Sequence, residues 1–518
     1  MDRINEKDLQ LFYLSSLFCA VNESCRKMNN VTYSSGDYRG DRVLSPFQKF
    51  LCKLAQVCDA EKGGDTITAL VALRAADGPL YHFASNGRKP SELESTKNFL
   101  SDLLGYVGRN PDGLAEKPLK KQVLHRILEF NLPRVLFYLK RVIASVGECI
   151  IATTHSSATQ GGTDIAARLR IIEDNATFPL PHDMQSDQGA RLKFLKDCET
   201  LLKTIQDAMA TGFSLVMNQG ANADDPETSH AWCQLRHHLG RLYSYRQAAE
   251  VIVETCRERP ELFAGFAVAF VPHSRPRRLP LPRTTAPSLE GAIKEAFPDR
   301  DIQAYADRIE QLRGYGLEDH VRGRLEQRSV QQNVHCEVLL RDFLVRGGMA
   351  RPQDYYDNGM FIATSKPPCR LCHYFFKDSE NDFLVQSSHM NVYPKWRLPD
   401  VYEEEEGQGQ GQDRDAVVAR REELLDDLIW QMQQDTLDVV REQHSQWKRN
   451  DSRTESWAEL SMHGGGSDTR ASGRFSSASG ASGQGTGTGA GAGGEGLGFG
   501  FRMPAAVENG GVSIGFAA

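Results

Sequence analysis

The feature that most constrains this chain is a pair of short motifs that unite three potential metal ligands with one carboxylate. The first motif is H-x-E, formed by His335 and Glu337, and the second is P-C-x-x-C, formed by Pro368, Cys369 and Cys372. Two cysteines three positions apart at the start of a helix project from one face, and proline is favoured at the first helical position. The fold must therefore bring the starts of two helices together.

This donor set is typical of a catalytic zinc site. Thiolates and a neutral imidazole are preferred zinc ligands, and the positive end of a helix lowers the pKa of a nearby thiol. Three protein ligands leave a fourth position for a water molecule, whose pKa falls toward ~7. We therefore predict His335, Cys369 and Cys372 as zinc ligands. Glu337, two residues after the histidine, is predicted as the catalytic carboxylate that moves protons.

The same residues admit a second interpretation. A C-x-x-C with a distant histidine can form part of a structural zinc site, with Cys336 or His373 as the fourth ligand. The placement of H-x-E at the start of a helix, and of P-C-x-x-C after a strand, favours the catalytic interpretation.

The segments around the motifs have an α/β pattern. Residues 360–365 form an apolar run of strand length before P-C-x-x-C, and residues 383–388 form the next one. Further upstream, residues 68–73 and 80–83 are predicted as a strand pair across a turn, although a helix end fits the first segment nearly as well. We therefore expect an α/β sheet around the motifs.

At this point the sequence resembles the zinc-dependent deaminase superfamily, which includes cytidine deaminases, RNA adenosine deaminases and DNA cytosine deaminases. The resemblance rests on residues 334–337, 365–372 and 388–399, and it covers about 70 residues, 330–399. Within the superfamily these segments look like a fungal branch of largely uncharacterised deaminase-like proteins. By analogy, the helix expected at 239–257 and the strand expected at 263–271 would be the first helix and strand of the superfamily fold.

The resemblance implies a three-layer α/β/α cytidine deaminase-like fold that holds Zn2+ on His335, Cys369 and Cys372, with Glu337 as proton shuttle. It implies hydrolytic removal of an amino group from a cytosine- or adenine-type base in a nucleoside, nucleotide or single-stranded nucleic acid. The motifs do not choose between these substrates. The alternative function is a non-catalytic deaminase-like zinc domain that serves as a structural, nucleotide-sensing or protein-interaction module.

Four residues near the motifs are assigned to substrate binding. Cys336 occupies the position inside H-x-E that is usually a small residue in the superfamily, and it could compete for the metal or be oxidised. Pro368 precedes the cysteine pair. His389 and Trp396 lie beyond the second strand, where together with Tyr393 they either line the pocket or pack in the core.

The composition divides the chain into five regions. Residues 1–210 are predicted as mainly helical and carry no recognisable chemistry, and residues 229–400 are predicted as the deaminase-like zinc domain. An acidic linker at 401–415 and an amphipathic helix at 416–450 follow. Residues 463–518 are rich in Gly and Ser and are expected to be disordered, because they offer little apolar surface to offset the entropy of ordering.

The charge balance excludes one functional class. With 61 Lys and Arg against 68 Asp and Glu, the formal net charge is −7, which rules out a generally basic nucleic-acid coat protein. A local exception is the segment from Arg275 to Arg283, where four arginines alternate with prolines. This segment is predicted as a solvated linker, and the sharper alternative is an arm that tracks phosphates.

The chain is expected to be intracellular, either cytoplasmic or nuclear. It shows no secretory signal, no apolar run long enough for a membrane helix, and 11 cysteines, which are expected to be thiols or metal ligands. The helix at 416–447 is expected to dock on its own chain, with a protein partner as the alternative. The oligomeric state is not fixed by the sequence.

Overall fold

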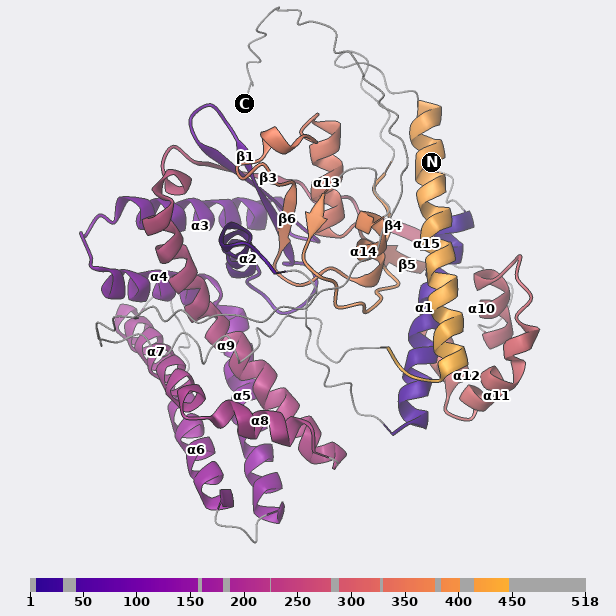
Figure 1. The fold of residues 1–518 in the computed structure, drawn as a ribbon, viewed down its shortest axis with the longest axis horizontal. Coiled ribbons are helices and arrows are strands. Elements are labelled where there is room, and N and C mark those ends of the chain that lie inside the picture. The colour runs from indigo at the N-terminus through magenta and orange to yellow at the C-terminus, as the bar shows by residue number, and fades with distance from the viewer. Residues whose placement is uncertain are drawn as a thin grey trace, which may run out of the picture. The chain divides into compact units, whose positions relative to one another are not determined.

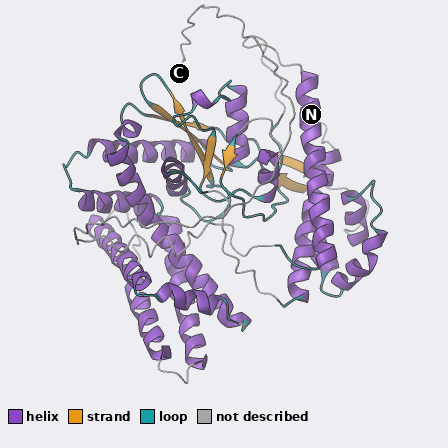
Figure 2. Cartoon of the chain, viewed as in Figure 1, coloured by secondary structure: helices purple, strands orange, loops and turns teal. Residues whose placement is uncertain are grey.

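Helices make up most of the part of the chain that this computed structural model describes (Figure 2). The described residues are 6–30, 43–156, 161–179, 187–223, 225–280, 288–326, 329–377, 383–400 and 414–446. The expectations for residues 463–518, for residues 401–413 and for Arg283 fall outside them. No helix in the described ranges combines the length and the apolar character that a membrane span requires.

The centre of the fold is a five-stranded mixed sheet (Figure 1). Its spatial order is β3 (Ala267–Val271), β2 (Pro79–Ser85), β1 (Thr68–Arg74), β6 (Phe361–Thr364) and β7 (Leu384–Val385). β1 runs antiparallel to both neighbours, with Leu70 opposite Phe83 on one side and Ala363 on the other. The β2–β3 and β6–β7 pairs are parallel. The predicted strand pair and the strands on either side of P-C-x-x-C are therefore confirmed, although β7 is shorter than the apolar run suggested.

Three groups of helices surround this sheet. The helices that belong to its two packed faces are α2 (Pro46–Cys58), α3 (Pro90–Arg109), α13 (Cys336–Arg346) and α14 (Arg370–Lys377). A helical bundle contains α4 (Glu116–Phe130), α5 (Leu132–Ser156), α6 (Gly161–Ala176), α7 (Gln188–Ala210), α8 (Phe213–Ala221) and α9 (Pro226–Glu258). The third group contains α1 (Glu6–Met28), α10 (Leu289–Ala296), α11 (Ala306–Arg313), α12 (Leu317–Leu325) and α15 (Arg414–Glu442).

Alternate residues of β1 belong to two different hydrophobic cores. Leu70 and Ala72 lie in the core that contains α2 and the bundle, whereas Val71 and Leu73 lie in the core that contains α13 and α14. Successive side chains of a strand point to opposite faces, so helices cover both faces of the sheet. The arrangement is mixed α/β with a helical layer on each side.

The sheet combines strands from two regions that the sequence analysis treated separately, residues 1–210 and residues 229–400. The strand beside β6 is β1, whereas the 263–271 segment forms a short 3-10 helix (Pro260–Phe263) and then β3 at the far edge. The helix at 239–257 belongs to α9 of the bundle. The analogy that made these segments the first helix and strand of the superfamily fold stays a prediction, because periodicity identifies an element but not its neighbour. Residues 229–400 therefore do not contain the whole sheet.

The arginine-rich segment forms a strand over residues 277–280 of its described part. Arg277 and Arg278 lie in β4 (Arg277–Pro280), which pairs antiparallel with β5 (Ser329–Gln332). Arg277 Nη2 lies 2.7 Å from Oδ2 of the buried Asp8, and Arg278 Nε donates to the hydroxyl of Ser329. The expectation of a linker is corrected for these two residues, because they lie in a paired strand. The phosphate-tracking arm stays a prediction.

The C-terminal amphipathic helix docks on its own chain, as expected. Leu428, Met432 and Val439 of α15 are buried in the core shared with α1. Arg370 of α14 adds a polar link, because its Nη1 lies 2.5 Å from Oδ2 of Asp435. These apolar residues of α15 are therefore packed within the chain.

The buried carboxylate of Asp59 joins the sheet to the helical bundle. It forms an ion pair with Arg134 of α5 and accepts hydrogen bonds from the hydroxyls of Thr66, at 2.7 Å, and Ser365, at 3.3 Å. Ser365 directly follows β6, so this carboxylate connects the bundle with the strand that leads into P-C-x-x-C. Burial raises the pKa of Asp59, but Arg134 outweighs this effect and holds the pKa below its ordinary value.

Asp59→Asn should lower the free energy of unfolding by about 3–5 kcal/mol, because Arg134 is then buried without a counter-charge. Urea denaturation followed by circular dichroism measures this change. The double variant Asp59→Asn/Arg134→Met should lose less than the sum of the single losses, and additive losses would contradict the pairing. Asp197→Asn, which removes a carboxylate paired with Lys193 on the surface of α7, is the control and should cost at most about 1 kcal/mol.

Lowering the pH should reduce the free energy of unfolding, because Asp59 becomes protonated. Because the pKa of Asp59 is lower in the folded state than in the unfolded chain, its stabilising effect is present above the unfolded value of ~3.9 and is lost as the pH falls through the folded value. Unfolding free energies measured between pH ~3 and ~7 should therefore fall less steeply below pH ~4 in Asp59→Asn than in wild type. Parallel curves would refute this assignment.

Candidate functional site

The start of α13 is fixed by contacts on both sides of His335. The amide of Cys336 donates to Oδ1 of Asn86, which directly follows β2, at 2.7 Å. Before the histidine, the amide of Asn333 donates to the carbonyl of Lys395 at 2.8 Å. His335 occupies the N-cap position with an extended backbone and no side-chain cap bond. Its imidazole is instead directed toward the cysteine pair.

The cysteine pair is fixed by the loop after β7. The carbonyl of Pro368 accepts a hydrogen bond from the hydroxyl of Ser388 at 2.8 Å and another from the amide of His389 at 3.1 Å. Cys369 stands one position before α14, and Cys372 lies in its first turn. As predicted from the three-residue spacing, both sulfurs face the same point.

The three predicted ligands form one compact cluster in the described part of the chain. The two sulfurs lie 3.5 Å apart, and Nδ1 of His335 lies 3.6 Å from Sγ of Cys369 and 3.4 Å from Sγ of Cys372. Tetrahedral zinc with bonds of ~2.3 Å to sulfur and ~2.0 Å to nitrogen places its ligand atoms ~3.5–3.8 Å apart. The cluster therefore fits one face of a zinc tetrahedron.

The two cysteines of the cluster differ in their electrostatics. Burial, the neighbouring Cys369 and the charge of Glu337 raise the pKa of Cys372 well above its usual value. Burial raises the pKa of Cys369, but the hydrogen bond from Cys372 and the charge of His335 outweigh it and bring the pKa well below its usual range. Nε1 of Trp396 donates to Sγ of Cys372 at 3.2 Å, which stabilises negative charge on that sulfur. Trp396, predicted as a substrate-binding residue, is thus placed against Cys372, one of the predicted metal ligands.

Glu337 lies in the first turn of α13, and its side chain is almost fully buried. It accepts a hydrogen bond from the thiol of Cys336, whose Sγ lies 3.4 Å from Oε2. Burial and the charge of Glu337 raise the pKa of Cys336 well above its usual value, so this cysteine remains a thiol. Among the described residues, neither Cys336 nor His373 belongs to the ligand cluster. This arrangement favours three protein ligands over a closed structural site.

A cavity of about 600 Å³ opens beside His335. Tyr393 lines it, and its ring centroid lies 6.0 Å from that of His335. The four residues assigned to substrate binding are absent from the described lining: Cys336, Pro368, His389 and Trp396. His389 is buried, and its ring packs edge-on against Tyr393. Of His389, Tyr393 and Trp396, Tyr393 is the one that lines this cavity.

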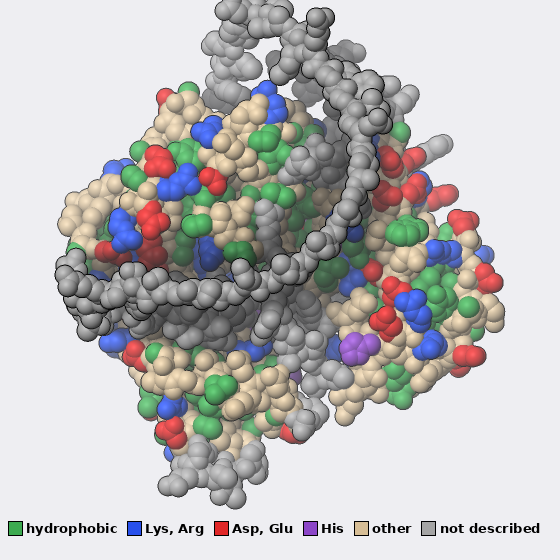
Figure 3. Space-filling view, viewed as in Figure 1, with side chains coloured by type: hydrophobic (Ala, Val, Ile, Leu, Met, Phe, Trp, Pro, Cys, Tyr) green, Lys and Arg blue, Asp and Glu red, His purple; other side chains and the backbone are tan. Residues whose placement is uncertain are grey.

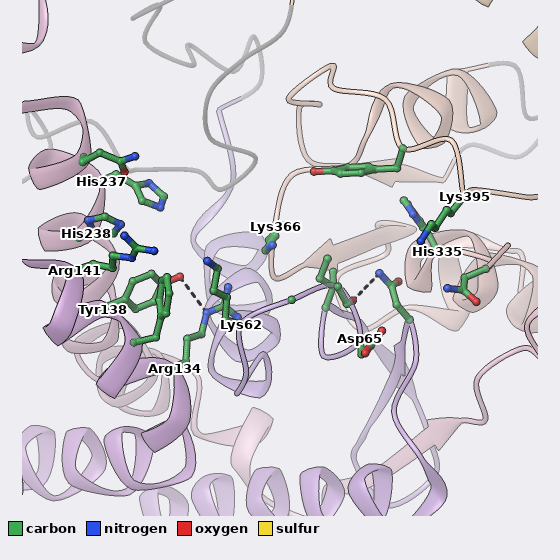
Figure 4. A pocket seen from close by; sticks show the side chains of 18 residues that line it. Lys62, Asp65, Arg134, Tyr138, Arg141, His237, His238, His335, Lys366 and Lys395 are labelled. Atoms are coloured by element: carbon green, nitrogen blue, oxygen red, sulfur yellow. Dashed lines mark hydrogen bonds between the residues drawn. The ribbon is translucent and has the colours of Figure 1, made fainter. Parts of the chain in front are cut away.

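The other wall of the cavity comes from residues that the sequence did not single out as site residues. Figure 4 shows Arg134, Tyr138 and Arg141 of α5 and the two histidines of α9 on the side away from His335, with Lys62 and Lys366 between. The spacing of the three α5 residues was a usable signal, because residues three and four apart share a helix face. Nothing local linked that face to the motifs 200 residues away.

Comparison with known proteins supports a deaminase-like family for the motif region. Residues 334–400 match the family model described as OTT_1508-like deaminase. The matched segment contains α13, β6, α14 and β7, and therefore all four motif residues. No curated protein and no solved structure matches the chain. The match supports deaminase activity in general, and the cavity wall formed by α5 and α9 lies outside it.

Trp396→Phe should weaken zinc binding about tenfold, because it removes the N–H donor to Cys372 while keeping an aromatic ring of similar shape. Competition with a chromophoric chelator measures the affinity. Trp430→Phe is the matched control, since Trp430 is 53% exposed on α15 and should leave the affinity unchanged. Equal zinc affinity in Trp396→Phe and wild type would contradict the role given to this indole.

Proposed function

We propose that the chain is a zinc-dependent hydrolytic deaminase with a cytidine deaminase-like fold, in the fungal branch that the motif segments resemble. Its substrate would be a cytosine- or adenine-type base in a nucleoside, nucleotide or nucleic acid. The observation that carries the proposal is the tetrahedral-face geometry of His335, Cys369 and Cys372, with Glu337 beside it and a cavity at the imidazole. The family match over residues 334–400 supports it.

His335, Cys369 and Cys372 would hold the zinc ion. Bound there, zinc supplies the Lewis acidity that makes water nucleophilic near neutral pH. Glu337 takes one proton from the attacking water and delivers it to the ring nitrogen of the base. It then takes the second proton of that water from the hydroxyl now on the attacked carbon and transfers it to the departing amino group. The carbon–nitrogen bond to the amino group breaks, a carbonyl forms at the same carbon, and ammonia leaves. The burial of Glu337 keeps competing water away from this carboxylate.

Glu337→Gln should retain zinc and lose ammonia release by at least ~100-fold, because the amide cannot accept and return a proton. Elemental analysis of the purified protein measures zinc, and an ammonia assay over nucleosides, nucleotides and single-stranded oligonucleotides measures turnover. Cys369→Ser should lose both zinc and activity. Cys256→Ser is the control, because Cys256 lies on α9 outside the ligand cluster.

Two results would contradict the proposal. Unchanged deamination in Glu337→Gln would refute the proton shuttle. Wild-type protein without zinc would refute the whole proposal.

One observation favours the second candidate, a non-catalytic zinc module for structural, nucleotide-sensing or protein-interaction purposes. The thiol of Cys336 engages the carboxylate that the reaction needs. Zinc bound at one ion per chain, with no ammonia from any substrate in either wild type or Cys336→Ala, would favour this module. Higher turnover in Cys336→Ala would show instead that the thiol only restrains an active carboxylate.

A further inference from the structure

The cavity beside His335 is much more cationic than the chain as a whole. Its described lining contains five Lys or Arg residues and one Asp, whereas the chain carries a net charge of −7. On the face drawn in Figure 3, Lys and Arg are interspersed with Asp and Glu. A positive cavity on an acidic chain is therefore a local feature that composition does not explain. The five cations are Lys62, Arg134, Arg141, Lys366 and Lys395.

Two of these cations are held in place by an aromatic ring. Nζ of Lys62 lies 3.9 Å from the ring centroid of Phe137, and the guanidinium carbon of Arg141 lies 5.5 Å from it. Cation–π contacts orient a charge without neutralising it. Phe137 itself lines the cavity, so both charges are presented at its wall.

The contribution of Arg134 is different. Its charge is balanced by the buried Asp59, and its Nε donates to the hydroxyl of Tyr138 at 3.1 Å. Arg134 therefore serves as a support for the wall. Lys366 also interacts electrostatically with Asp59. Lys62, Arg141 and Lys395 therefore supply the positive field, against the carboxylate of Asp65 in the described lining.

We propose that this wall binds the phosphate of the substrate, so that the enzyme acts on a phosphorylated nucleotide in preference to a nucleoside. The inference rests on the deaminase function proposed above, and it places the base toward His335 and Tyr393 and the phosphate toward Lys62 and Arg141. A cavity of about 600 Å³ has the size of a site for one small ligand. Figure 4 shows the cations and His335 bordering the same space.

The wall that selects phosphate is built by the 59–67 loop and α5, outside the segment that matches the deaminase family. The motif region thus supplies the reacting groups, and the helical region supplies substrate selection. This gives the otherwise unassigned N-terminal region a role in the same site.

The test is calorimetric binding to the full-length, zinc-loaded protein. The probes are cytidine, adenosine, their 5′-monophosphates and a short single-stranded oligonucleotide. The monophosphate of the accepted base should bind at least about tenfold more tightly than its nucleoside, because charge-assisted hydrogen bonds to phosphate each contribute on that scale. Raising the salt concentration should reduce this difference.

The variant Lys62→Gln/Arg141→Gln should lose most of the preference for the monophosphate. Lys140→Gln is the matched control, since it removes a charge from an exposed position of the same helix that does not line the cavity. A thermal unfolding scan shows whether each variant is folded. Loss of the preference in Lys62→Gln alone would support the proposal if the double variant failed to fold.

Equal affinity for nucleoside and monophosphate in wild type, or an undiminished preference in folded variants, would overturn the phosphate site. Tighter binding of the oligonucleotide, lost in the same variants, would support the site and identify a nucleic-acid strand as the source of the phosphate. Failure of the deaminase proposal is recognised separately, because phosphate-dependent binding without ammonia release would leave this site intact and remove the reaction.

Discussion

The buried ion pair between Asp59 and Arg134 is the interaction on which the site depends. A carboxylate without solvent is tolerated only when its charge is matched and its lone pairs accept hydrogen bonds, and Asp59 meets both conditions through Arg134, Thr66 and Ser365. These partners come from the bundle, from the loop before β1 and from the residue after β6. One side chain thus sets the spacing between the motif strand and the cationic wall.

The site has a negatively charged side, formed by the motif residues, and a positively charged side, formed by residues near the helical bundle. On the motif side, two sulfurs, an imidazole and the carboxylate of Glu337 form an electron-rich cluster, which the proposed zinc ion would balance. On the bundle side, Lys62 and Arg141 present positive charge. The sheet and the ends of its strands hold these groups apart, so that a ligand with a neutral base and an anionic tail can satisfy both.

The sequence predicted the local structure of the motif region well and the tertiary contacts around it poorly. The H-x-E and P-C-x-x-C motifs lie at the starts of α13 and α14, as their local spacing required. The arginines at 277 and 278 were misjudged, because Asp8 and Ser329, which engage them, are remote in sequence. Trp396 was expected to contact the substrate, but its indole N–H donates a hydrogen bond to Cys372. The difference depends on the orientation of one side chain, which the sequence does not specify.

What the sequence determined by itself was local: the motif residues predicted as ligands, the helices that present them and the strands between them. These properties follow from residue type and from periods of two and 3.6 residues, which act over short distances along the chain. The tertiary structure alone decided that β1 lies beside β6 and that α5 faces His335. Such choices depend on contacts between segments hundreds of residues apart, whose free energies arise from burial and charge pairing that no local pattern records.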